Sequence, residues 1–172
     1  SNLRQRIADR EDWRGLEQDF YLDPTIYEFE LNRIWKSGWL MAGHSCEIPR
    51  PGDYLTLHVD TDSIVVIRGD DGRVRAFHNL CRHRGTRLLT ESSGCVGRIV
   101  CPYHQWTYAR DGKLVACRGM QNDVDTQELS LFACQVEELD GLILISLSKS
   151  PPDFAPAAAM LGPMLRPQGL AR

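Results

Sequence analysis

Residues 81–85, Cys-Arg-His-Arg-Gly, and residues 101–106, Cys-Pro-Tyr-His-Gln-Trp, are the two segments around which this chain is organised. Each segment places a histidine two or three positions after a cysteine. The four candidate metal ligands are Cys81, His83, Cys101 and His104. Ligands this close together need tightly turning backbones, which Gly85 and Pro102 favour. The sequence therefore predicts two short loops that face each other across a metal centre.

Two thiolates and two neutral imidazoles are the ligand set of a Rieske centre, in which both cysteines bind one iron of a [2Fe-2S] cluster and both histidines the other. Imidazoles carry less negative charge than thiolates, so they raise the reduction potential. A structural zinc site is the alternative, since zinc also accepts two Cys and two His. Zinc sites typically begin with a cysteine pair and end with a histidine pair. The mixed pairs of this chain favour the iron–sulfur cluster.

The composition predicts an ordinary globular protein. Its 172 residues, 42% hydrophobic and 25% charged, suit one domain, or one and a small part of another. A net charge of −3 indicates no nucleic-acid partner. We also expect no membrane partner, because no apolar run reaches the roughly 18 residues of a spanning helix. We expect no signal peptide and a cytoplasmic location. Four further cysteines are expected to be small buried hydrophobes and not disulfides: Cys46, Cys95, Cys117 and Cys134.

Residues 10–36 are predicted to be helical. Asp23 and Pro24 form a start signal, as the N-cap and the first helical residue. An apolar stripe from Tyr27 to Trp35 then predicts packing against the sheet or a partner subunit. Gly38 is expected to end the helix.

From Trp39 onward, short apolar runs alternate with turn residues. Asp-Gly pairs at 71–72, 111–112 and 140–141 predict hairpins, because they tolerate the positive φ angles of tight turns. Residues 119–130 are expected to form a surface loop, with a calcium loop on Asn122, Asp123 and Asp125 as the less favoured alternative. We expect strands at residues 39–43, 54–59, 64–67, 73–78, 98–100, 105–109, 113–116, 131–136 and 142–147.

The two motif segments resemble those of the N-terminal Rieske domain of ring-hydroxylating-type oxygenase α-subunits. The resemblance covers roughly residues 20–147, and residues 43–49 look more like the branch that acts on quaternary ammonium compounds than like the naphthalene or biphenyl branch. It implies a mainly β, antiparallel Rieske β-sandwich with N-terminal helices. The implied organisation is an N-terminal helical segment (1–38), a Rieske [2Fe-2S] domain (39–149) and a Pro-rich linker (150–172) toward an absent catalytic domain. Its prolines predict at most a short helical turn around 157–161.

The resemblance also implies the site residues. Cys81, His83, Cys101 and His104 would bind the [2Fe-2S] cluster, with Arg84 and Trp106 completing the cofactor-binding set. The catalytic domain of the family holds a mononuclear Fe(II) on two histidines and a carboxylate. This chain has five histidines, and those outside the cluster set make no such group. We therefore expect no catalytic residues here, and a fragment that transfers electrons without activating oxygen itself.

The implied partners are an NADH-dependent flavin reductase or ferredoxin as electron donor and the catalytic domain of a neighbouring protomer, in a homotrimer, as acceptor. The implied reaction is O2-dependent hydroxylation or demethylation of an aromatic or quaternary ammonium substrate. One alternative is a free-standing Rieske-type ferredoxin, which would need neither the N-terminal helices nor the linker. A remote alternative is a zinc-stabilised binding module.

The surroundings of the two loops suggest how the cluster is tuned. Respiratory Rieske proteins carry two extra cysteines, which would fall at Thr86 and Tyr103, and a serine near Gln105-Trp106. Their absence predicts fewer hydrogen bonds to the sulfurs and a potential near the low end of the range, about −150 mV. Three arginines form a candidate docking patch for an acidic ferredoxin or the catalytic domain, with a solvated surface as the alternative: Arg82, Arg84 and Arg87. His78 and Asn79 are expected to brace the first loop. Trp106 is expected to shield the cluster, with ordinary packing in the core as an equal alternative that is compatible with it.

Overall fold

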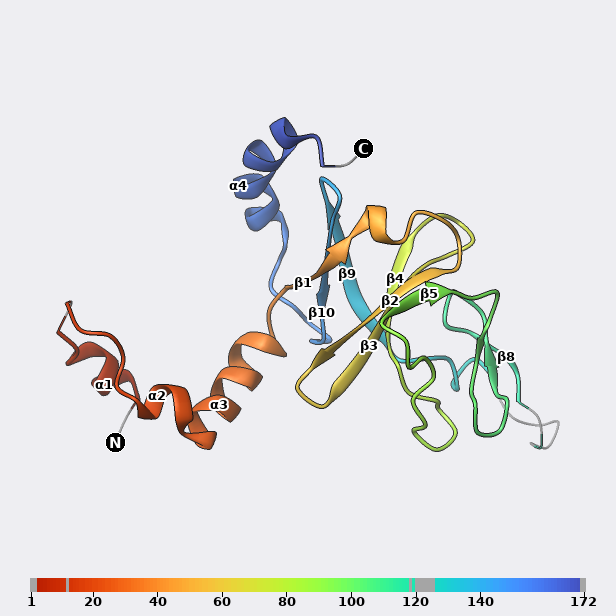
Figure 1. Ribbon diagram of the computed structural model, residues 1–172, viewed down its shortest axis with the longest axis horizontal. Helices are drawn as coiled ribbons and strands as arrows, with labels where there is room; N and C mark the ends of the chain where they lie inside the picture. Colours follow the sequence, from red (N-terminus) through yellow and green to blue (C-terminus); the bar gives the residue numbers. More distant parts are fainter. Residues whose placement is uncertain (1–2, 12, 118, 120–125, 171–172) are drawn as a thin grey trace.

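Short strands joined by tight turns build two antiparallel sheets, with helical segments before and after them (Figure 1). The computed structural model describes residues 3–11, 13–117, 119 and 126–170. The strands are β1 (Leu40–His44), β2 (Asp53–Val59), β3 (Asp62–Arg68), β4 (Val74–His78), β5 (Ser93–Cys95), β6 (Ile99–Val100), β7 (Thr107–Tyr108), β8 (Leu114–Ala116), β9 (Ala133–Leu139) and β10 (Leu142–Ser146). The larger sheet has the order β1-β10-β9-β4-β3-β2-β5 and the smaller β6-β7-β8. The predicted fold class is confirmed.

Strand β5 has no counterpart among the strands expected from the sequence. Its three residues are exposed and carry no apolar alternation. It pairs with β2, where Asp53 lies opposite Cys95 and Leu55 opposite Ser93. Backbone hydrogen bonds to an established strand, and not side-chain burial, therefore define this edge of the sheet.

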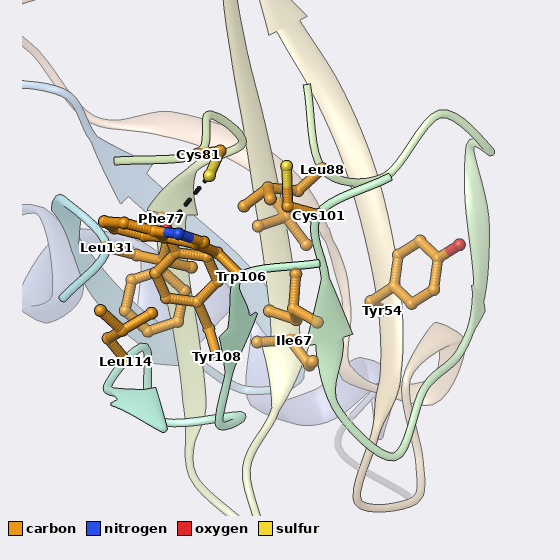
Figure 2. Close-up of a cluster of buried hydrophobic side chains, with 12 residues drawn as sticks. Tyr54, Ile67, Phe77, Cys81, Leu88, Cys101, Trp106, Tyr108, Leu114 and Leu131 are labelled. Carbon is orange, nitrogen blue, oxygen red and sulfur yellow. Dashed lines mark hydrogen bonds between the residues drawn. The ribbon is translucent and has the colours of Figure 1, made fainter. Parts of the chain in front are cut away.

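Strand β3 lies between two hydrophobic cores. Its side chains are buried on both faces of the sheet, which explains why its apolar residues are consecutive in the sequence and do not alternate with polar ones. Val65 and Ile67 point into the first core, which also contains both loop cysteines (Figure 2), whereas Ile64 and Val66 point into the second. The first core comprises Tyr54, Val65, Ile67, Phe77, Cys81, Leu88, Ile99, Cys101, Trp106, Tyr108, Leu114 and Leu131. The second comprises Ile48, Leu55, Ile64, Val66, Val74, Ala76, Cys134, Ile143 and Ile145.

The Asp-Gly pairs lie at the turns that they predicted. Asp140 and Gly141 both have positive φ, 48° and 92°, and connect β9 to β10 in a tight hairpin. Gly72 and Gly112 have φ of 78° and 86° in the turns before β4 and β8. The turn between β2 and β3 uses Asp60 at φ 55° instead of a glycine. Asp tolerates this conformation because its short polar side chain can bond locally.

The N-terminal region is not one helix. It consists of α1 (Leu3–Ala8), α2 (Asp19–Leu22), α3 (Pro24–Glu30) and a π-helix, η1 (Leu31–Trp35). The start signal is confirmed, because the Asp23 side chain accepts a hydrogen bond from the Thr25 amide at 2.8 Å and Pro24 follows. The helical conformation expected over residues 10–36 is wrong for residues 13–18, which form turns and irregular backbone. The chain turns back instead, and Arg6 of α1 pairs with Glu17 at 2.6 Å and lies over the Phe20 ring.

The apolar stripe of this region is only partly covered. Ile26 and Leu31 are buried, whereas Tyr27, Ile34 and Trp35 are each about half exposed. In Figure 1 helices α1 to α3 project away from the sheets as an arm. The expected packing against the sheet therefore holds for the base of the arm and not for its length.

The C-terminal region contains more helix than its prolines predicted. Helix α4 (Ala155–Leu165) spans eleven residues and is followed by a short 3-10 helix, η3 (Arg166–Gln168). Pro156 is tolerated because it lies in the first turn, where its missing N–H has no intrahelical acceptor. The segment before α4 is held to the strands by Trp39, whose indole donates to the Pro152 carbonyl at 2.8 Å and packs against the Phe154 ring.

All six cysteines are free. Cys134 is buried as expected, and burial raises the pKa of its thiol to about 12. Cys46 and Cys95 are exposed, so the expectation of buried hydrophobes is wrong for them. Asn122, Asp123 and Asp125, which suggested a calcium loop, lie outside the described residues. No helix in the described part of the chain is long and apolar enough to cross a membrane.

Gly112 offers a test of how the turns are fitted to the core. A Cβ at this position would clash with the Phe77 ring, whereas a Cβ at Gly72 would meet open space. Both glycines have positive φ, so we expect Gly72→Ala to cost about 1 kcal/mol of backbone strain and Gly112→Ala about 3 kcal/mol, because it adds overpacking. Urea unfolding of both variants measures the difference. Equal losses would contradict the proposed fit against Phe77.

Candidate metal centre

The first motif loop is the tip of a small hairpin. Leu80 and Arg87 form a β-bridge at its base. Inside that bridge the Cys81 amide donates to the Thr86 carbonyl at 2.8 Å, and the Gly85 amide donates to the Cys81 carbonyl at 2.9 Å. Gly85 has φ of 69°, which explains why a glycine stands there.

The second motif loop repeats this pattern. Val100 pairs with Thr107 at its base, the Cys101 amide donates to the Trp106 carbonyl at 2.8 Å, and the Gln105 amide donates to the Cys101 carbonyl at 3.0 Å. Gln105, with φ of 60°, is the counterpart of the glycine in the first loop. The turning residue of this loop is thus Gln105, whereas the sequence had pointed to Pro102.

The two loops bring the four predicted ligands together in two kinds of environment. Cys81 and Cys101 are almost fully buried, and Figure 2 shows both sulfurs at the same edge of the first core. His83 and His104 are half-buried, and their Nδ1 atoms are 3.1 Å apart. Burial, followed by the charges of His104 and Arg84, lowers the pKa of His83, which favours the neutral ring that a metal requires.

This donor set fits a [2Fe-2S] cluster with mixed ligands. Buried thiols suit an inner iron, and imidazoles near the surface suit an outer one. Each loop supplies one donor of each kind, as the sequence predicted. Within the described residues, no three His, Cys, Asp or Glu side chains are arranged to hold a single ion.

Tyr108 is the residue that the sequence reasoning missed. It lies in β7, on the second hairpin, yet its hydroxyl reaches the first loop. The hydroxyl accepts a hydrogen bond from the Arg82 amide at 3.0 Å and lies 3.3 Å from the Cys81 sulfur, so its own proton is free to point at that sulfur. Burial and this contact raise the pKa of Tyr108. The signal that could have found it is its register, because it lies two residues after buried Trp106 on the same strand face.

Trp106 and the arginines have separate roles. Trp106 is buried, and its ring is stacked on His83 with centroids 4.8 Å apart and planes at 10°. Arg82 does not belong to the basic patch, because its guanidinium donates to the Ser130 carbonyl at 2.8 Å and lies over the Phe132 ring. Arg84 and Arg87 are exposed, so they alone remain of the predicted patch.

Asn79 braces the base of the first loop, as predicted. It is fully buried. Its amide nitrogen donates to the Leu89 carbonyl at 2.6 Å and to Ser63 Oγ at 3.2 Å, and its Oδ1 accepts from the Leu89 amide at 2.9 Å. The backbone amide of His78 donates a hydrogen bond to the Phe132 carbonyl. Asn79 therefore ties both ends of the first loop to β3.

Comparisons with known proteins identify the kind of domain that carries these loops. Residues 38–137 match the family model described as "Rieske [2Fe-2S] domain". The glycine betaine monooxygenase oxygenase subunit of Chromohalobacter salexigens is 43% identical over 166 residues, covering 96% of this chain and 36% of that protein. The chain thus spans little more than a third of the length of that relative.

Solved structures share the fold. The quaternary ammonium Rieske monooxygenase CntA in complex with L-carnitine is 33% identical with a TM-score of 0.80, covering 87% of this chain and 43% of that one. Naphthalene 1,2-dioxygenase with bound indole is 32% identical with a TM-score of 0.77, covering 86% and 35%. The chain is therefore similar to oxygenases that differ in their bound compounds.

The brace at Asn79 can be tested by removing its side chain. Asn79→Ala leaves the part-buried Leu89 amide and carbonyl without their Asn79 partners, so we expect a loss of about 3 kcal/mol in unfolding free energy. Ser63→Ala removes only the 3.2 Å contact and should cost about 1 kcal/mol. Urea denaturation compares the two variants. A loss at Asn79 no larger than at Ser63 would show that the loop does not depend on this amide.

Proposed function

The chain belongs to the Rieske [2Fe-2S] domain family, and from this we propose that Cys81, His83, Cys101 and His104 bind its cluster for electron transfer in an oxygenase. The observation that carries the proposal is the repeated hairpin tip, which supplies one buried thiol and one half-buried imidazole from each loop. When bound, such a cluster stores and releases single electrons.

The surrounding residues would give this centre a buried side and a side that faces the surface. The buried cysteines hold it against the first core, where water is excluded. Trp106 covers one face of the His83 ring, while Tyr103 stacks on His104 with centroids 3.8 Å apart and is itself exposed. We propose that electrons enter or leave on the histidine side, with exposed Arg84 as a charged neighbour.

The relatives support a proposal for the wider function. We propose that the chain is the electron-transfer part of a larger oxygenase subunit, with a helical segment at 1–38, the cluster domain at 39–149 and a connection at 150–172. An NADH-dependent flavin reductase or a ferredoxin would supply electrons. The mononuclear Fe(II) of a neighbouring protomer, in a homotrimer, would receive them. A quaternary ammonium substrate is supported by the 43% identity to a glycine betaine monooxygenase subunit.

The cluster assignment predicts a defined metal content. Reconstituted anaerobically, the chain should bind two irons and two sulfides and give, after dithionite reduction, the rhombic EPR signal of a cluster with mixed ligands. Cys81→Ser and His104→Ala should each lose most of the iron.

Matched controls are Cys46→Ser and His58→Gln, which change the same residue types outside the loops. Both should keep full iron content. A finding of one zinc ion per chain and no EPR signal would contradict the cluster assignment and indicate a structural zinc site.

Tyr108 predicts a shift in potential. Its hydroxyl lies 3.3 Å from the Cys81 sulfur, and a hydrogen bond to a ligand sulfur stabilises the reduced, more negative cluster. Tyr108→Phe should therefore lower the potential by about 40 mV, the one-electron equivalent of a hydrogen bond of about 1 kcal/mol. Protein-film voltammetry measures the shift. Tyr54→Phe, in the same core, should leave the potential unchanged.

A further inference from the structure

Trp106 has a buried indole N–H without a partner in the part of the chain that the structure describes. The residue is 2% exposed, and its Nε1 atom is shut off from solvent. The indole of Trp39, by contrast, donates to the Pro152 carbonyl at 2.8 Å. Trp13 and Trp35 are at least half exposed, so water can reach them. A buried donor is costly when it is left unpaired, so the Trp106 N–H needs an explanation.

The side chains packed around this indole supply no evident acceptor. Trp106 belongs to the first core, which otherwise consists of hydrocarbon side chains, two tyrosines and the two loop cysteines. The Tyr108 hydroxyl is already engaged with the Arg82 amide and the Cys81 sulfur. Figure 2 shows the Tyr54 hydroxyl on the far side of this core from Trp106. A water molecule would need about two to four polar partners here, which hydrocarbon walls do not provide.

The ring borders the candidate metal centre. It is stacked on His83 with planes at 10°, and it shares the first core with Cys81 and Cys101. Figure 2 shows the indole near the edge of the core that carries both cysteine sulfurs. In the proposed assignment His83 serves the outer iron and the cysteines the inner one, so the indole contacts residues of both iron sites. The inorganic sulfides of a [2Fe-2S] cluster lie between its two irons.

We propose that the Trp106 indole N–H donates a hydrogen bond to a sulfide of the cluster. The chemistry of the two groups is matched, because an indole N–H can only donate and a sulfide can only accept. The inference rests on the proposed function, since it requires the cluster. It assigns the indole nitrogen a role that is separate from the stacking of the same ring on His83.

This hydrogen bond would tune the cluster. A donor to a cluster sulfur stabilises the reduced, more negative state and raises the reduction potential. The sequence predicted few such donors, because the serine of respiratory Rieske proteins is missing near Gln105-Trp106. The Trp106 N–H would supply a donor from the same place in the chain. The Tyr108 hydroxyl, which lies against the Cys81 sulfur, would act beside it on a ligand sulfur.

The test is pulsed EPR (HYSCORE) of the reconstituted, dithionite-reduced 172-residue chain, with ¹⁵N at the indole nitrogen of its tryptophans. A nitrogen that is hydrogen-bonded to a cluster sulfur receives unpaired spin density, so we expect an indole ¹⁵N coupling. The coupling should persist in Trp13→Phe, Trp35→Phe and Trp39→Phe, and it should vanish in Trp106→Phe. Persistence in the first three variants assigns the coupling to Trp106 even if Trp106→Phe does not fold, which circular dichroism reports.

The reduction potential gives a second readout. Trp106→Phe keeps an aromatic ring beside His83 but removes the N–H. We expect its potential to fall by about 40 mV, which corresponds to a change of about fivefold in the one-electron equilibrium at about 59 mV per tenfold. Trp39→Phe removes an indole N–H that is bonded to the Pro152 carbonyl and should leave the potential unchanged. A merely structural role of the Trp106 ring would leave the ¹⁵N spectrum without a coupling.

The outcomes separate this inference from the cluster assignment, because iron and sulfide are assayed in every sample. A parent protein that carries the cluster but shows no indole coupling would overturn the inference and leave the cluster assignment intact. A coupling that persists in Trp106→Phe, or an unchanged potential in that variant, would also overturn it. A parent protein that binds no cluster would overturn the proposed function, and this inference with it.

Discussion

The Tyr108 hydroxyl fixes the geometry on which the candidate centre depends. The two cysteine–histidine loops come from different hairpins, and a metal cluster between them requires that their separation does not drift. Tyr108 is carried by the second hairpin, but its hydroxyl is bonded to the Arg82 amide and lies against the Cys81 sulfur of the first. Because the ring is fully buried in the first core, this contact is held by packing on all sides.

The two loops show how one backbone arrangement can be reached from different sequences. Each cysteine amide donates to the carbonyl five residues later, and each cysteine carbonyl accepts from the amide four residues later. The fifth residue of each loop has positive φ, Gly85 in one and Gln105 in the other. The histidine occupies the third position in the first loop and the fourth in the second. The shift brings the two imidazoles from opposite loops to within 3.1 Å of each other at Nδ1.

The parts of this structure that could be predicted from the sequence depend on local chemistry. Asp23 with Pro24 predicted a helix start, and Asp140 with Gly141 a hairpin, because the backbone preference of these residues is strong by itself. The mixed spacing of cysteine and histidine likewise indicated the centre. What could not be predicted depends on contacts between distant segments. Arg82 contacts Ser130 and Phe132, which lie 48 and 50 positions further along the chain. The Tyr108 contact joins two different hairpins. The turn after α1 brings Arg6 to Glu17, a contact that an apolar periodicity does not report.

The position of strand β3 between the two cores affects how the protein unfolds. Its alternate side chains belong to different cores, so neither core can lose its packing while the other keeps a complete wall. The region around the motif loops and the region beneath β1 and β10 are therefore thermodynamically linked, although they share few side chains. Unfolding should be a single cooperative event for the sheets, and a ligand that stabilises one core should slow hydrogen exchange in the strands of the other. Through β3, the stability of the candidate metal centre is therefore coupled to residues of the second core that do not contact it.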